Sequence, residues 1–103
     1  MPRHTEALPR DAVRDLLGIC RALYASRRAE GATTDELSKL AEAGALLVDA
    51  LDLARTQPVT VGHRAAWAKA ERGTAMLLEL LATSDSSSAA LVAAWAGRLT
   101  AQG

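Results

Sequence analysis

The sequence contains no phenylalanine, and its aromatic residues are limited to Trp67, Trp95 and Tyr24. Half of the 103 residues are nevertheless apolar, so the core has to consist mainly of Leu, Val and Ala. Such a composition is typical of packed helices and excludes an aromatic-rich sheet or sandwich. Only three prolines interrupt the chain, and a lone cysteine, Cys20, excludes an intramolecular disulfide. These absences indicate a helical domain in a reducing compartment.

An excess of charge of one sign is also missing, because twelve basic residues balance twelve acidic ones. A chain without net charge has no general attraction for nucleic acid or for an anionic membrane. No apolar stretch reaches the ~20 residues that a membrane-spanning helix needs, and the first eight residues lack the features of a signal peptide. We therefore expect a soluble, cytoplasmic protein without membrane contact. Arginine outnumbers lysine ten to two and alanine is the commonest residue, which is a bacterial-like composition.

Four stretches repeat apolar residues with the i, i+3, i+4, i+7 spacing of an amphipathic helix. The expected helices cover residues of about 9–29, 34–55, 59–82 and 87–101, and Pro9 is expected as the first helical residue. Short connections between long helices are typical of antiparallel neighbours. We therefore predict an all-α protein with a single domain over residues 1–103, folded as an antiparallel four-helix bundle with up-down-up-down topology.

The first two predicted helices fold back on each other about Gly31, a residue suited to a left-handed helix C-cap. Thr33 and Glu36 follow with the spacing of a capping box. In that motif the Thr hydroxyl accepts from the Glu backbone N–H and the Glu side chain reaches back to the Thr N–H. A tight helical hairpin is predicted here.

Charges on this hairpin occupy mirrored positions about the turn, and each series repeats every seven residues. Opposite charges along a helix–helix seam can fix its register, although exposed pairs contribute only about 0–1 kcal/mol each. Two solvated faces that align by chance would show the same pattern. The predicted ladder pairs Arg28 with Asp35, Arg21 with Glu42, and Arg14 with Asp49.

Three glycines, Gly18, Gly44 and Gly73, lie inside predicted helices, where each costs roughly 1 kcal/mol relative to alanine. Close approach of a second helix is the compensation expected at such positions.

No combination of residues specifies catalysis. His63 is the best candidate for a chemical role, but Ala66 and Trp67 stand where histidine phosphotransfer domains carry Lys and Gly. Neither His4 nor His63 has a Glu three residues before it, as a di-iron bundle requires. An apolar environment would raise the pKa of Cys20 and make it inert. We expect no catalytic residue, no metal site and no cofactor.

Two surfaces remain as candidates for binding. The predicted fourth helix carries Arg98 as its only charge and small residues around much of its circumference, and the second helix has an apolar stripe beside its main face. Alanine is also a strong helix former, so this composition fits an ordinary exposed helix equally well. The candidate partner interface consists of Leu46, Leu53, Ala90, Ala94 and Gly97. The candidate basic face consists of Arg10, Arg14, Arg21 and Arg28.

These surfaces give two functional hypotheses. The first is a small non-catalytic helical protein–protein interaction or regulatory adaptor module that self-associates, with a partner whose identity the sequence does not encode. The alternative is a nucleic-acid-associated regulator that uses the arginines of the first helix. The charge balance disfavours nucleic acid, and internal pairing of the arginines in the ladder would remove that face altogether.

Overall fold

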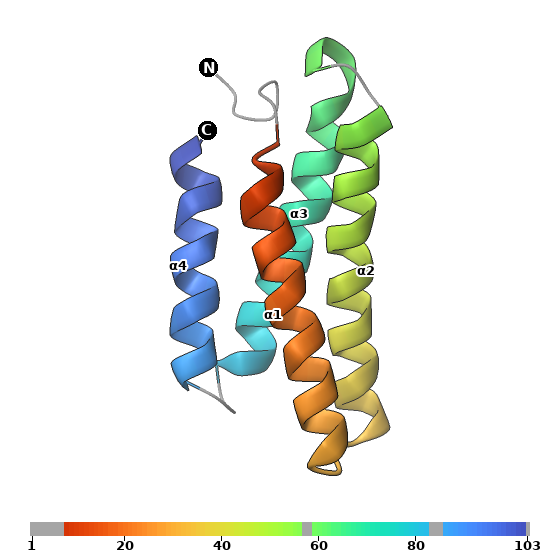
Figure 1. Cartoon of the computed structure of the whole chain (residues 1–103), viewed down its shortest axis with the longest axis vertical. Helices are drawn as coiled ribbons and strands as arrows, with labels where there is room; N and C mark the ends of the chain where they lie inside the picture. The colour runs from red at the N-terminus through yellow and green to blue at the C-terminus, as the bar shows by residue number, and fades with distance from the viewer. Residues whose placement is uncertain (1–7, 57–58, 83–85, 103) are drawn as a thin grey trace.

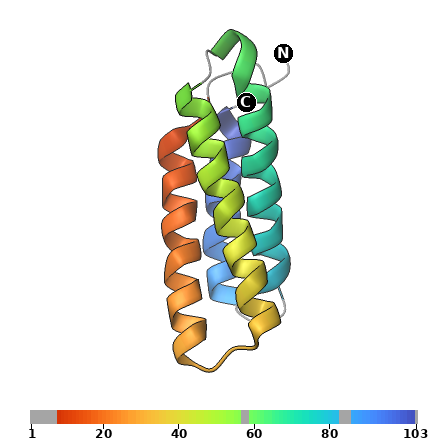
Figure 2. The same cartoon turned by 90° about the vertical axis from the view of Figure 1, so that its right-hand side faces the viewer.

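The described residues form a bundle of four antiparallel helices, in which each helix contacts the next and α4 contacts α1 (Figures 1 and 2). A computed structural model describes the backbone of residues 8–56, 59–82 and 86–102, with side chains described outside 59–63, 86, 88 and 98–102. The helices are α1 (Arg10–Ala29), α2 (Thr34–Thr56), α3 (Val59–Leu81) and α4 (Ser86–Gln102). Each predicted boundary is correct within one residue. The all-α class and the up-down-up-down topology are confirmed, and the described part of the chain contains no strand.

The core is aliphatic, as the composition requires. Trp67 is its largest side chain and is fully buried, and Leu16, Leu47, Leu77 and Val92 surround the centre from all four helices. The one buried polar side chain among the described residues is Thr74, whose hydroxyl donates to the carbonyl of Ala70 at 2.8 Å. That hydrogen bond satisfies the hydroxyl within its own helix.

The turn between α1 and α2 confirms the predicted hairpin. Gly31 has φ +82°, and its N–H donates to Arg28 O at 3.2 Å while the N–H of Ala32 donates to Arg27 O at 3.0 Å. These two bonds form a Schellman motif, which requires the left-handed conformation that glycine adopts without strain. The start of α1 differs slightly from the prediction, because Pro9 is the N-cap and Arg10 is the first helical residue.

Half of the predicted capping box forms. The N–H of Glu36 donates to Thr33 Oγ1 at 3.2 Å, which caps α2 as expected. The carboxylate of Glu36 instead forms an ion pair with Arg27 of α1 at 3.5 Å, with both side chains half-buried. The second half of the box is therefore replaced by a contact across the hairpin.

The predicted close approach of a second helix is confirmed at Gly73. A Cβ atom on Gly73 would lie 3.0 Å from the carbonyl oxygen of Ala43 and 3.2 Å from Leu46 Cβ, so α3 crosses α2 closely there. At Gly44 the nearest atom would be Cys20 Sγ at 3.5 Å, an ordinary contact with α1. Gly18 faces open space and has no packing role. The closest helix approach is thus between α2 and α3, which also share the most extensive contact.

The fourth helix is attached less extensively than the others. It packs against α1 and α3, and Val92 is its one fully buried residue among those described. Trp95 and Ala89 are partly buried against the same core. Most of the circumference of α4 consequently faces solvent, as its position at one side of the ring in Figure 1 indicates.

Candidate functional site

The predicted charge ladder does not form. Arg14 pairs within its own helix with Asp11 at 3.3 Å, and Asp49 pairs with Lys69 of α3 at 3.7 Å. Asp35 pairs within α2 with Lys39 at 3.6 Å. Of these two acidic residues of α2, Asp49 thus reaches α3 and Asp35 stays within its own helix, and neither pairs with an arginine of α1. The ladder prediction is wrong, and the register of the hairpin is set by core packing and by the turn.

The arginines of α1 are therefore available at the surface. Arg10, Arg14, Arg21 and Arg28 are all exposed, and Arg21 and Arg28 have no ion-pair partner among the described residues. A spacing of seven residues places Arg14, Arg21 and Arg28 on one side of the helix. Pairing of these arginines with the acidic residues of α2 would have removed the basic face, and that pairing is absent among the described residues.

Arg21 also lines a groove between α1 and α2, which we call the α1/α2 groove. The groove has a volume of about 310 Å³ and is mostly apolar. Leu17, Arg21 and Tyr24 form its α1 lip. The side of α2 contributes small or aliphatic residues: Ala41, Gly44, Ala45 and Val48. Sequence reasoning missed this groove, although the run of small residues in α2 was a signal that could have found it.

Cys20 lies at the floor of the α1/α2 groove and is 2% exposed. Its thiol donates to the carbonyl of Leu40 at 3.2 Å. Burial raises the pKa of this thiol above its ordinary value of 9.0, while the nearby Arg21 guanidinium and a backbone hydrogen bond at Gly44 oppose the shift. A thiol that keeps its proton is a poor nucleophile and a poor metal ligand, which supports the expectation that Cys20 is unreactive.

The raised pKa of Cys20 predicts a loss of stability at alkaline pH. Above pH 9 the thiol of the unfolded chain ionises while the folded thiol stays protonated, so rising pH favours unfolding until the folded thiol also ionises. Below pH 9 the contribution is constant. Chemical denaturation across pH 7 to 10 should therefore show a steeper alkaline decline for the wild type than for Cys20→Ala. Parallel pH profiles for the two proteins would contradict this assignment.

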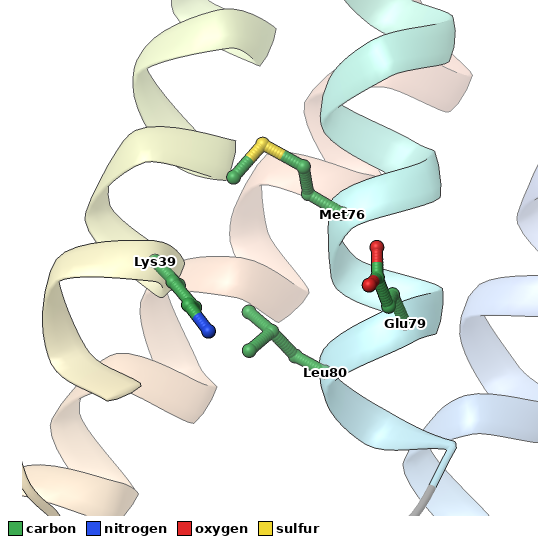
Figure 3. A pocket seen from close by; sticks show the side chains of 4 residues that line it. All are labelled: Lys39, Met76, Glu79 and Leu80. Atoms are coloured by element: carbon green, nitrogen blue, oxygen red, sulfur yellow. The ribbon is translucent and has the colours of Figure 1, made fainter. Parts of the chain in front are cut away.

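A second hollow lies between the N-terminal part of α2 and the C-terminal part of α3 (Figure 3). It has a volume of about 330 Å³ and is lined by Lys39, Met76, Glu79 and Leu80. Lys39 and Leu80 point toward each other across the gap, and Met76 reaches over them toward α2. The two charged side chains, Lys39 and Glu79, do not point toward a common position in the hollow, and the other two lining residues are apolar. The described side chains that line the hollow therefore do not form a catalytic arrangement.

The predicted partner interface divides into two parts. Leu46 is only 7% exposed and lies against Gly73 of α3, so the expectation that it offers a free surface is wrong. Leu53 is partly buried against the same core. The second apolar stripe of α2 is covered by α3 because a helix in a ring has to contact two neighbours.

The α4 residues of that interface are exposed. Ala90, Ala94 and Gly97 face solvent, and a Cβ atom on Gly97 would have no neighbour within 4 Å. Leu91 is 49% exposed and is the one large hydrophobic residue of the described set that is exposed. None of the described side chains of α4 is charged. We call Ala90, Leu91, Ala94 and Gly97 the α4 face.

Other predicted features fall partly outside the described set. His63 belongs to the first turns of α3, but its side chain is not among those described, and His4 precedes the described residues. Within the described residues, no three His, Cys, Asp or Glu side chains lie close enough together to hold a metal ion. No described helix is both long enough and apolar enough to cross a membrane.

Comparison of this chain with protein-family models, with curated proteins and with solved structures found no match.

Proposed function

We propose that this chain is a small, non-catalytic protein–protein interaction module that self-associates through the α4 face. The observation that carries the proposal is the half-exposed Leu91 on a helix whose described side chains bear no charge. A depletion of charge around an exposed apolar residue distinguishes the centre of an interface from ordinary surface. Ala90, Ala94 and Gly97 beside it would let a second helix approach closely, since interhelical distance depends on the size of the contacting side chains.

Self-association through one helix face favours a twofold dimer, in which the same surface of each copy meets its equivalent. Because α4 contacts α1 and α3 less extensively than α2 contacts its neighbours, enough of the surface of α4 stays exposed for this contact. A second helix against the α4 face would cover Leu91, and the buried apolar surface would contribute about 25 cal/mol per Å² before the cost of association.

Substitution of Leu91 by Asp should weaken the dimer at least tenfold, because a carboxylate would be desolvated at the centre of the contact. Sedimentation velocity over a range of concentrations measures the effect. Ala68→Asp is the matched control, since it adds the same charge at an exposed position on α3. A wild-type protein that stays monomeric at high concentration, or equal dissociation constants for the two variants, would contradict the proposal.

Association with nucleic acid is the second candidate, and the observation that favours it is the unpaired state of Arg21 and Arg28. Its signature would be binding to duplex DNA that weakens steeply as salt is raised, because phosphate contacts release counterions. Binding should also be lost when Arg14 and Arg21 are both replaced by Ala.

A further inference from the structure

The α1/α2 groove has an asymmetric distribution of charge. Its floor contains apolar atoms of Cys20 and Leu40, and its α1 lip carries Arg21 between Leu17 and Tyr24. Arg14 and Arg28 lie seven residues to either side of Arg21, so they extend the same lip by two turns in each direction. The α2 lip is formed by Ala41, Ala45 and Val48 and has no charge of its own.

Carboxylates of α2 do not neutralise this lip. Asp49 is paired with Lys69 on the side of α3, and Asp35 is paired with Lys39. Asp52, one turn beyond Val48, is paired with Arg55 at 3.4 Å. An apolar groove therefore lies beside Arg21 and Arg28, which have no ion-pair partner among the described residues, while Arg14 is paired with Asp11 of its own helix.

We infer that the α1/α2 groove binds a short amphipathic helix from another protein, with an apolar stripe flanked by glutamate or aspartate. Apolar side chains of that helix would fill the groove over Gly44, and its carboxylates would pair with Arg21 and with Arg14 or Arg28. Charge-assisted hydrogen bonds between guanidinium and carboxylate are among the stronger and more directional contacts that a surface offers. This surface is distinct from the α4 face, so the inference does not depend on self-association.

The dimensions of the groove agree with such an occupant. From Leu17 to Tyr24 the α1 lip advances about 10 Å, which is two helical turns. A two-turn helix presents apolar side chains at i, i+4 and i+7 along that length, the pattern of helix-in-groove recognition. The contact is small, so the expected affinity is in the micromolar range or weaker.

Nucleic acid fits this surface less well. A phosphate backbone would use the arginines but would leave the apolar floor of the groove unoccupied. Glu42, which is exposed on α2 next to Ala41, would repel phosphate and would also repel a carboxylate placed on that side, so the carboxylates of the peptide have to lie along the α1 edge of the groove.

The test is a titration of the isotopically labelled 103-residue chain with two synthetic amphipathic helical peptides, followed by two-dimensional NMR. The peptides share the same apolar residues and carry either Glu or Lys beside the stripe. The Glu peptide should shift the amide signals of Arg21, Tyr24 and Ala45, and the Lys peptide should not. Arg21→Glu should weaken binding of the Glu peptide about tenfold and allow the Lys peptide to bind.

Arg72→Glu is the matched control, because Arg72 is exposed on α3 and does not line the groove. Ala45→Trp fills the groove without altering the arginines and should abolish the shifts. Three results would overturn the inference: equal binding of both peptides, shifts that Arg21→Glu and Ala45→Trp leave unchanged, or a preference of the same amides for a duplex DNA probe with steep salt dependence. The titration should give the same result with the Leu91→Asp variant, in which self-association through the α4 face is weakened.

Discussion

Replacement of Trp67 by alanine is expected to lower the free energy of unfolding by about 3–5 kcal/mol. The side chain is fully buried and is the largest in the core. Its removal loses the transfer free energy of the indole and leaves a cavity that the surrounding helices can fill only in part. A domain of this size has a total stability of about 5–15 kcal/mol. The loss is therefore a large fraction of the total stability, and the variant should unfold at a clearly lower urea concentration than the wild type when the transition is followed by far-UV circular dichroism.

Leu91→Ala provides the matched comparison for Trp67→Ala. It also truncates a large apolar side chain, but one that is 49% exposed and belongs to the weakly attached α4. The change in unfolding free energy should stay near 0.5 kcal/mol when measured at low protein concentration, where self-association does not contribute. Similar losses for the two variants would show that Trp67 is not the central residue of the core.

Gly73→Ala is expected to destabilise the protein by about 1–3 kcal/mol, even though alanine is the better helix former. The added methyl group would lie 3.0 Å from the carbonyl oxygen of Ala43 and 3.2 Å from both Leu46 Cβ and Leu47 Cγ. A backbone carbonyl inside a helix cannot rotate away, so α2 and α3 would have to separate along their most extensive contact. Denaturant melts of the variant and the wild type measure the difference.

Gly18→Ala should have the opposite sign. Nothing lies within 4 Å of a Cβ atom at that position, so the variant gains helix propensity without a collision and should be about 0.5–1 kcal/mol more stable. Two identical substitutions inside helices are thus predicted to change stability in opposite directions. If both stabilised the protein, α2 and α3 would pack less tightly than described.

Helix positions could be predicted from the sequence because each depends on local signals. The apolar spacing defines the helices, and Gly31 and Thr33 define the first turn through backbone conformation and a single capping bond. None of these signals requires knowledge of how one helix is rotated relative to another. The predicted boundaries consequently agree with the structure within one residue.

Side-chain partners could not be predicted in the same way, because they depend on the rotation of each helix about its own axis. The ladder assumed that Arg28 would meet Asp35, whereas the pair that crosses the hairpin is Arg27 with Glu36. The rotation of α2 about its own axis also turns Leu46 toward α3 and places small residues of α2 along the α1/α2 groove. The exposed, uncharged side of α4 was predictable because its composition of small residues with Arg98 as the only charge is visible in the sequence.

The order of the helices around the ring has a consequence for how the chain folds. Each of the two most extensive contacts, α2 with α3 and α1 with α2, joins helices that are adjacent in the sequence. Only short loops have to close before these contacts form, and proteins rich in such local contacts fold in microseconds to milliseconds. The contact between α4 and α1 spans the longest stretch of chain and is among the less extensive ones. We therefore expect α4 to dock last, onto a unit formed by the first three helices, so that Leu91 is carried by the last helix to be added.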